Sequence, residues 1–457
     1  MGAGRNRSLG STLLTLSTWI RRQPLLSVLR IILPQRLRSA IHGAMTASIR
    51  NRMRFATLPS KAVDQRLAAP IAGAEGAAYL STAGVNIFAY LRGQFGLGES
   101  ARMYARALLE AGYPVSLIDI DIPLPHGLED ETFDALIGEE APHAINLIFV
   151  NPDYLNVAIE KIGRARMQGR YVIACWFWEL EDIPNDWTPA LEQVDEILVA
   201  SEFVENAFRR ATNKPILRVS LQLSKIQDSG LTRRDFGLDD DKFLFLTSFD
   251  FNSSLHRKNP QAVIVAFRQA FPERGDVQLL VKSSNGHRCP QRLFQLMEVA
   301  DGDERIVVRD EVIDRAHMQA LQRCVDAYVS LHRAEGFGLG MAECMLVGKP
   351  VVATAWSGNL DFMGPGNSCL VDYQLVPVGE EEYPHATGAR WAEPNIATAA
   401  AYMRRLVDDP EFKASIGRQA AIDVGVALLP EKAAQALIGR FTEIAAMHDV
   451  AISRYGA

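Results

Sequence analysis

The chain has 457 residues, of which 48% are hydrophobic and 22% are charged. Such a composition is ordinary for a globular protein, and the length allows two domains with additional segments. The five cysteines are scattered without a C-x-x-C pair, and the nine histidines show no H-x-x-x-H spacing. The sequence therefore argues against a structural zinc site and favours a reducing compartment.

The charge is distributed unevenly along the chain. Residues 1–63 contain eleven Lys and Arg residues and no acid, and Asp64 is the first carboxylate. Since the whole chain carries a net charge of −6, the remainder carries −17. We therefore predict a basic arm and linker over residues 1–78, attached to an acidic globular body.

The basic arm mixes its arginines with leucine, isoleucine and tryptophan. Arg21, Arg22 and Arg30 interrupt each apolar run before it reaches the ~18–20 residues of a membrane span. The stretch from Leu9 to Ile20 ends in two arginines without a small-residue cleavage site, which argues against a signal peptide. We predict that the arm lies on an anionic membrane surface; a disordered arm, or a helix docked elsewhere on the chain, is the alternative. We expect no nucleic-acid partner, because the body is acidic and carries no recognisable binding motif.

Strand and helix patterns alternate along the body of the chain. The first series predicts strands at Val85–Leu91, Val115–Ile120, Ile145–Val150, Tyr171–Trp176 and Glu196–Ala200, and helices at Glu99–Ala111 and Glu202–Ala211. The second series predicts strands at Phe243–Phe249, Val277–Val281, Arg305–Val308, Asp326–Leu331 and Pro350–Ala353, and helices at Pro260–Phe271, Pro290–Val299, Arg315–Cys324 and Gly340–Val347. This alternation predicts two parallel, doubly wound α/β sheets. We place the two domains at residues 79–225 and 226–430, followed by a C-terminal helix at 431–457.

The segment from Leu331 to Gly348 is the most informative part of the chain. Its glycines lie where a predicted strand gives way to a helix. Glycine lets the backbone approach a ligand, and a helix start presents free N–H groups to an anion. Glu335 and Glu343 flank this turn, so both carboxylates face one ligand from two sides. Backbone donors for phosphate, with carboxylates for hydroxyl groups, suit a nucleotide sugar.

Glu335-x7-Glu343, with Gly-Phe-Gly-Leu between the glutamates, resembles the signature of the retaining family 4-type (group 1) glycosyltransferases of the GT-B fold. The resemblance implies two Rossmann-like domains that face a cleft, with C-terminal helices bracing the first domain. It also implies that Glu335 contacts hydroxyl groups of the donor sugar and that Glu343 holds the ribose. The backbone positions that approach the donor are then Gly336, Phe337, Gly338 and Leu339.

Arg257 and Lys258 form a basic pair directly before a predicted helix. Adjacent cations neutralise a diphosphate, both in the ground state and as the leaving group gains charge. Lys258 resembles the phosphate-binding lysine of the family, whereas the family's arginine usually lies several residues before the position of Arg257. With Glu335, this pair makes up the predicted catalytic residues. Further donor-site candidates at strand ends of the same sheet are Lys282, Asn285 and Asp361.

A glycine-rich loop, Gly93–Ser100, ends the first predicted strand and opens a helix. No acidic residue is placed to hold an NAD ribose, so we do not interpret it as a dinucleotide fingerprint. In a GT-B protein this loop faces the cleft, which makes Gly96 and Gly98 candidates on the acceptor side. A tight turn with glycines needed only for packing is the alternative.

The run Trp176-Phe-Trp-Glu-Leu-Glu181, with the P-x-x-W and V-D-E-I runs that follow, resembles a bacterial subset of these transferases linked to cell-surface polysaccharides. Aromatic rings beside a carboxylate can stack on a sugar and hold its hydroxyl groups. We predict that Trp178 and Glu179 face the cleft on the acceptor side. Strand alternation makes at least one of the two tryptophans a core residue.

Together these patterns predict a retaining hexosyltransferase that moves a hexose from a nucleotide-diphospho-sugar to a glycan or lipid-linked sugar acceptor in surface polysaccharide synthesis. We expect it in the cytoplasm, or peripherally on the inner face of the cell membrane. The resemblance implies no metal site, and we expect no cofactor. Two alternatives are a GT-B nucleotide-sugar epimerase and an inactive transferase-like carbohydrate-binding or scaffold protein. The presence of Glu335, Glu343 and Lys258 argues against an inactive protein.

Overall fold

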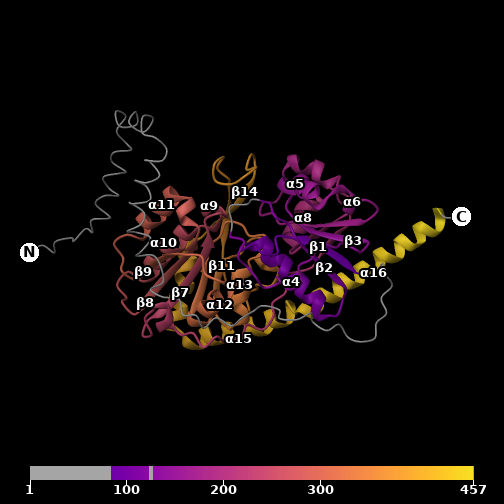
Figure 1. The fold of residues 1–457 in the computed structure, drawn as a ribbon. Coiled ribbons are helices and arrows are strands. Elements are labelled where there is room, and N and C mark those ends of the chain that lie inside the picture. Colours follow the sequence, from indigo (N-terminus) through magenta and orange to yellow (C-terminus); the bar gives the residue numbers. More distant parts are fainter. Residues whose placement is uncertain (1–83, 123–126, 456–457) are drawn as a thin grey trace, which may run out of the picture.

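The computed structural model describes residues 84–122 and 127–455. The predicted basic arm lies outside these residues. Figure 1 shows two α/β domains side by side, with the C-terminal helices running beneath them, one under the second domain and the last, long helix under the first. Each domain is built on a six-stranded parallel sheet, as the alternating sequence pattern predicts.

The first sheet has the strand order β2-β1-β3-β4-β5-β6. Its strands are β1 (Val85–Ala89), β2 (Val115–Asp119), β3 (Ile145–Phe149), β4 (Tyr171–Cys175), β5 (Glu196–Val199) and β6 (Ile216–Arg218). Its helices are α4 (Gly96–Glu110), α5 (Pro152–Ile162), α6 (Arg164–Met167), α7 (Thr188–Leu191) and α8 (Glu202–Arg209). Strands β1, β3 and β5 are buried at every residue. Burial on both faces explains why they read as continuous apolar runs in the sequence.

The second sheet has the strand order β12-β11-β10-β7-β8-β9. Its strands are β7 (Phe243–Asp250), β8 (Val277–Ser284), β9 (Ile306–Asp310), β10 (Ala327–Ser330), β11 (Val351–Thr354) and β12 (Cys369–Val371). Its helices are α9 (Leu255–Lys258), α10 (Pro260–Ala270), α11 (Pro290–Ala300), α12 (Arg315–Cys324), α13 (Leu339–Leu346), α14 (Ile396–Asp408) and α15 (Pro410–Ala427). The predicted strands and helices are confirmed to within three residues at each end. Strands β6 and β12 and helices α5, α6, α7 and α9 were not predicted.

An antiparallel hairpin, β13 (Tyr373–Pro377) and β14 (Arg390–Pro394), follows the second sheet. It was not predicted either. The loop between its strands reaches the first domain, where His385 Nε2 lies 3.4 Å from Asp153 Oδ1. The hairpin therefore bridges the two domains, and it lies at the top of the molecule between them in Figure 1.

The chain passes from one domain to the other twice, near Leu223 and near Leu428, and a backbone hydrogen bond connects these two segments. The Leu223 N–H donates to the Leu428 carbonyl at 2.8 Å. After this point α16 (Pro430–Tyr455) runs back to the first domain, where it contacts α4. Leu437, Phe441 and Ile444 are fully buried, as expected for one helical face. Helix α16 therefore braces the first domain, as predicted for this fold.

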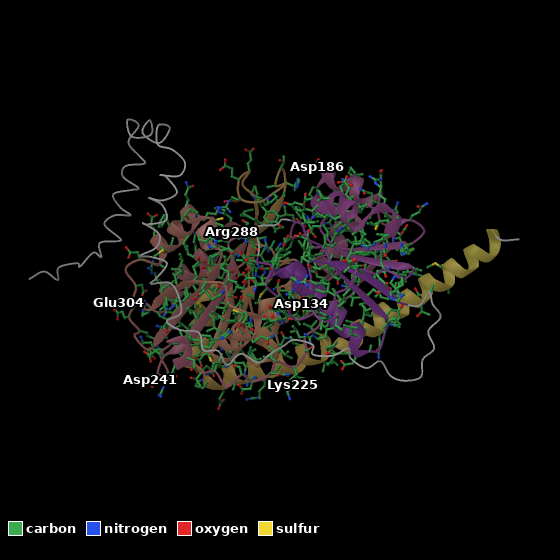
Figure 2. The ribbon with its side chains drawn as sticks, in the orientation of Figure 1. Asp134, Asp186, Lys225, Asp241, Arg288 and Glu304 are labelled. Atoms are coloured by element: carbon green, nitrogen blue, oxygen red, sulfur yellow. The ribbon has the colours of Figure 1, made fainter. Side chains whose placement is uncertain are left out.

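Charged side chains cover the outside of the molecule. The exposed residues labelled in Figure 2 are Asp134, Asp186, Lys225, Asp241, Arg288 and Glu304. Within the part of the chain that the structure describes, no helix is both long and apolar enough to cross a membrane.

Candidate active site

Two cavities adjoin between the domains, at the carboxyl ends of the strands. The Glu343 cavity, of ≈ 620 Å³, is lined by residues that include Glu99, Lys282, Asn285, Arg315 and Glu343. The Glu335 cavity, of ≈ 520 Å³, is lined by residues that include Asn151, Glu179, Arg257, Lys258, Glu335 and the backbone at 336–341. Phe95, Gly96 and Leu339 line both cavities, so the two are continuous. The two signature glutamates therefore face the two halves of one extended site.

The start of α13 forms the wall where the two cavities meet. Gly338, its N-cap, has a φ of +97°, a left-handed conformation that favours glycine. A Cβ atom on Gly336 would lie 3.3 Å from the Trp178 carbonyl oxygen, so a side chain there would crowd the first domain. The first backbone N–H groups of a helix have no partner within the helix. This turn therefore presents amide donors to the site, as the glycines predict.

Glu335 is held by two cations. Its Oε1 lies 2.5 Å from Lys258 Nζ, and its Oε2 lies 3.3 Å from Arg257 Nη1. Burial by itself raises the pKa of Glu335, but Lys258 and Arg257 together lower it to about 2. The carboxylate is therefore ionised at neutral pH and is an acceptor for hydroxyl groups.

Arg257 joins carboxylates from both domains. Besides Glu335 it reaches Glu179 of the first domain, with 3.4 Å between Nη2 and Oε1, and it donates to the Ala334 carbonyl at 2.9 Å. Burial opposes its charge, but these two carboxylates raise the pKa of Arg257 above its usual value. Glu179 and Glu335 already match the charge of Arg257. Lys258 has a more exposed side chain and is therefore the better placed cation for a phosphate.

Tyr383, at the tip of the β13–β14 hairpin, covers this group. Its hydroxyl donates to Glu179 Oε2, and its ring lies beneath the Arg257 guanidinium, 5.9 Å from the ring centroid. Burial and the Glu179 carboxylate raise the pKa of Tyr383. The neutral phenol therefore fixes the orientation of Glu179, which does line the cavity as predicted.

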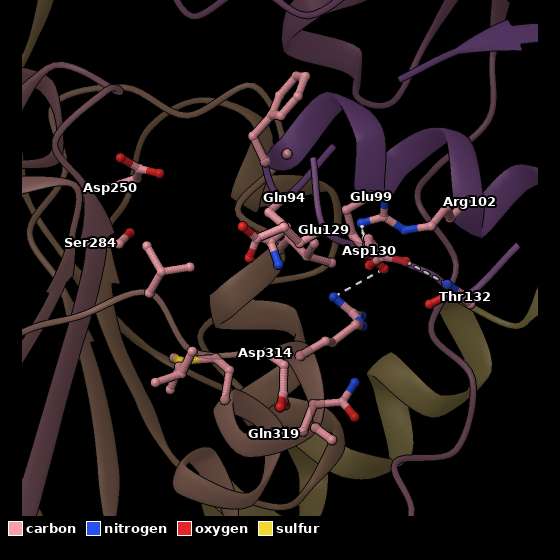
Figure 3. A pocket seen from close by; sticks show the side chains of 18 of the residues that line it. Gln94, Glu99, Arg102, Glu129, Asp130, Thr132, Asp250, Ser284, Asp314 and Gln319 are labelled. Carbon is pink, nitrogen blue, oxygen red and sulfur yellow. Dashed lines mark hydrogen bonds and ion pairs between the residues drawn. The ribbon is translucent and has the colours of Figure 1, made fainter. Parts of the chain in front are cut away.

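Glu343 is also oriented by neighbours. Arg315 Nη2 lies 2.7 Å from its Oε1, and Gln322 Nε2 donates to its Oε2 at 2.8 Å. Across the cavity, Lys282 is almost fully buried, and burial lowers its pKa to about 8 although Asp250 and nearby acids oppose this. Figure 3 shows Glu99 and Arg102 on one side of this cavity, with Asp250 and Ser284 on the other.

Three predicted site residues lie outside both cavities. Trp178 is only 4% exposed, its ring packs against Trp187, and its indole N–H donates to the Asp182 carbonyl, so it is a core residue. Asp361 accepts the backbone N–H of Glu202 at 3.0 Å and so joins the domains outside the cavities. A Cβ on Gly98 would lie 2.7 Å from the carbonyl oxygens of Tyr90 and Gly93, so this glycine serves packing. These three residues therefore do not line the cavities in which they were predicted.

The remaining predicted residues line the site. Phe337 lines the Glu335 cavity and packs on Phe362 with ring centroids 5.2 Å apart. Asn285 lines the Glu343 cavity and donates to Asp250 at 2.9 Å. Residues missed from the sequence are Glu99, Arg315 and Tyr383. Glu99 lies within the glycine-rich loop motif, and Arg315 directly follows Asp314, which caps its helix. Neither position indicates in the sequence which residue its side chain contacts.

Comparisons with solved structures define the fold class. Sucrose-phosphate synthase from Thermosynechococcus elongatus is similar with a TM-score of 0.58 and 15% identity, over 80% of this chain and 100% of that chain. Alr3699/HepE from Anabaena, solved in complex with UDP and glucose, has a TM-score of 0.55 and 14% identity, over 79% and 100%. The fold of this protein is GT-B.

Residues 242–383 match the family described as "Glycosyl transferases group 1". Residues 242–383 therefore carry a group 1 glycosyltransferase domain, which confirms the group 1 part of the resemblance noted around Glu335 and Glu343. Trehalose synthase from Rubrobacter xylanophilus is 26% identical over 210 residues, which is 45% of this chain and 44% of that protein. The chain thus matches less than half the length of this relative.

Proposed function

We propose that the protein is a retaining glycosyltransferase that moves a hexose from a nucleotide-diphospho-sugar to a glycan or lipid-linked sugar. The observation that carries the proposal is the pair Glu335 and Glu343, which face two continuous cavities on either side of the α13 start. A nucleotide sugar has a ribose and a sugar separated by a diphosphate. The site has a carboxylate for each end and backbone amides between them.

The donor then extends along both cavities. Glu343 accepts hydrogen bonds from the ribose, and Lys282, which lines the same cavity, meets the phosphates. The diphosphate lies at the α13 start beside Lys258, and Glu335 accepts hydrogen bonds from the sugar hydroxyls. Cations and fixed amides in a buried site stabilise the charge that develops on a departing diphosphate.

The transfer itself requires no protein nucleophile in this account. The bond between the anomeric carbon and the phosphate oxygen breaks while the acceptor oxygen bonds that carbon on the same face. The acceptor proton passes to the departing β-phosphate. Lys258 and the α13 amides stabilise the leaving group, so the reaction needs no metal cofactor.

The acceptor approaches from the first domain, where Glu179 and Asn151 line the Glu335 cavity. Surface polysaccharide synthesis is the proposed setting, supported by the Trp-Glu-Leu segment of the sequence. The basic arm at residues 1–63 then holds the enzyme at an anionic membrane where a lipid-linked acceptor resides.

Thermal-shift measurements with UDP-, GDP- and ADP-sugars, followed by NMR of the product, test the proposal. One nucleotide series should raise the melting temperature, because a ligand stabilises the state that it binds. With an acceptor, the product should keep the donor's anomeric configuration. Inversion of that configuration would reject the retaining mechanism, and conversion of the donor without an acceptor would indicate an epimerase.

A further inference from the structure

A chain of ion pairs joins Glu343 to the first domain. Arg315, the first residue of α12, lies 2.7 Å from Glu343 Oε1 through Nη2 and 3.1 Å from Glu99 Oε1 through Nη1. Glu99 belongs to α4, in the other domain. One guanidinium therefore connects the carboxylate proposed for the ribose with a carboxylate on the opposite wall of the cleft.

Glu99 is itself fixed within the first domain. Arg102 Nη2 lies 2.8 Å from Glu99 Oε2 and 3.3 Å from Asp130 Oδ2, and Arg102 Nη1 donates to the carbonyls of Leu91 and Gly93 at 2.9 Å each. Figure 3 shows Glu99, Arg102 and Asp130 together at the start of α4. The position of Glu99 is therefore a property of the first domain, not of the cavity.

Electrostatics favours this arrangement although it is buried. Burial lowers the pKa of Arg315, but Glu99 and Glu343 raise it above its usual value. Burial likewise raises the pKa of Glu99, but Arg315 and Arg102 lower it overall. A guanidinium bonds two carboxylates at once through its fixed fork of N–H groups, which a lysine ammonium does not reproduce.

The Glu343 carboxylate can still accept hydrogen bonds while it is paired with Arg315. A carboxylate has about four acceptor sites. In the structure Oε2 accepts one hydrogen bond, from Gln322, while Oε1 forms an ion pair with Arg315 and accepts no hydrogen bond. A ribose diol can take the others. If the cleft opened, Glu99 would move away from Arg315. The Nη1 group of Arg315 would then have no carboxylate from the first domain and could bond Glu343, where it would compete with the ribose.

We propose that Arg315 is a positioning residue that makes recognition of the donor ribose depend on closure of the cleft. The inference rests on the proposed function, because it assumes a nucleotide at Glu343. With the domains together, Glu99 shares Arg315 and leaves Glu343 open to the ribose. By reciprocity, a bound nucleotide favours the closed arrangement of the domains.

The test combines nucleotide binding with a double-mutant cycle. Isothermal titration of the nucleoside diphosphate selected by the wild-type protein is repeated with Arg315→Gln, Glu99→Gln and the double variant. Charged hydrogen bonds of this kind predict that each single change weakens binding roughly tenfold or more. The double variant should bind no more weakly than Arg315→Gln alone, because both changes break the same connection. Arg315→Lys should restore only part of the affinity.

Two controls separate this role from a purely structural one. Asp361→Ala removes another hydrogen bond between the domains, in which the Glu202 N–H donates to the Asp361 carboxylate, and should change the affinity less than twofold. Small-angle X-ray scattering should show compaction of the wild-type protein by the nucleotide and little change in Arg315→Gln. Only variants whose melting temperatures match that of the wild-type protein are compared.

The outcomes distinguish the inference from the function beneath it. Wild-type affinity in Glu99→Gln, or additive effects in the double variant, would overturn the coupling and leave the donor site intact. A wild-type protein that binds no nucleoside diphosphate would overturn both.

Discussion

Glu335 and Lys258 form an ion pair in the wall of the cleft, with 2.5 Å between Oε1 and Nζ. The pair joins the carboxylate proposed for the donor sugar to the cation proposed for the diphosphate. Both groups line the same cavity, beside the backbone of the α13 start. The sugar and the leaving group would thus be positioned by two side chains that hold each other.

Replacing Glu335 should reduce turnover more than nucleotide binding. Glu335→Gln keeps the size of the side chain but loses the charge that orients Lys258 and accepts the sugar hydroxyls. We expect kcat to fall roughly 100-fold or more, as for loss of an interaction that acts mainly in the transition state. Affinity for the bare nucleoside diphosphate should change roughly threefold at most. Glu381→Gln, at an exposed carboxylate outside the cavities, is the matched control, and equal loss of binding and turnover in Glu335→Gln would contradict the assigned role.

Donor affinity should fall as pH rises through about 8. Lys282 is charged below its pKa of about 8 and neutral above it. The phosphate groups of the ligand ionise with a pKa of about 6 or below, so their own titration adds little between pH 7 and pH 9. Titrations at pH 7 and pH 9 should therefore show weaker binding at the higher pH, and Lys282→Met should remove most of the difference. A wild-type affinity independent of pH would show that Lys282 does not meet the phosphates.

Transfer activity should survive an excess of EDTA. In the proposed site, Lys258 and the backbone amides at the start of α13 meet the diphosphate charge without a metal. The assay compares initial rates with and without EDTA at saturating donor. Loss of activity with EDTA, restored by Mg²⁺ or Mn²⁺, would contradict the metal-free account.

Membrane attachment through residues 1–63 is a prediction from the sequence alone, since these residues lie outside the described structure. Each Lys or Arg near an anionic surface contributes about 1 kcal/mol, an effect that salt weakens. The intact chain should float with anionic vesicles at low salt and much less at high salt. A truncated chain that begins near Ala68 should remain unbound while still binding donor. If the intact and the truncated chain floated equally with the vesicles, the arm would have a role other than membrane attachment.

The sequence predicted the fold well because its signals are local. Buried parallel strands such as β1 and β3 appear as short apolar runs, and glycines mark the start of α13. Glu335 and Glu343 were found for the same reason, since both lie beside one turn.

The contacts between the domains could not be predicted, because they join residues far apart in the chain. Arg315 meets Glu99 across 216 positions and Tyr383 meets Glu179 across 204. Trp178 was expected in the cleft because strand alternation predicts the face of the sheet to which a side chain points. Alternation does not predict which other residues pack on that face. Here Trp187 and Tyr383 cover the ring.

The central claim is that the two cavities bind a nucleotide-diphospho-sugar with Glu343 at the ribose. Isothermal titration of UDP, GDP and ADP, and of their sugars, into the wild-type protein and Glu343→Gln tests it most directly. We predict that one nucleotide series binds the wild-type protein and binds Glu343→Gln roughly 10- to 100-fold more weakly, the effect of losing a charged hydrogen bond. If no nucleotide binds the wild-type protein, or if a folded Glu343→Gln binds as tightly, the assignment of this site is wrong.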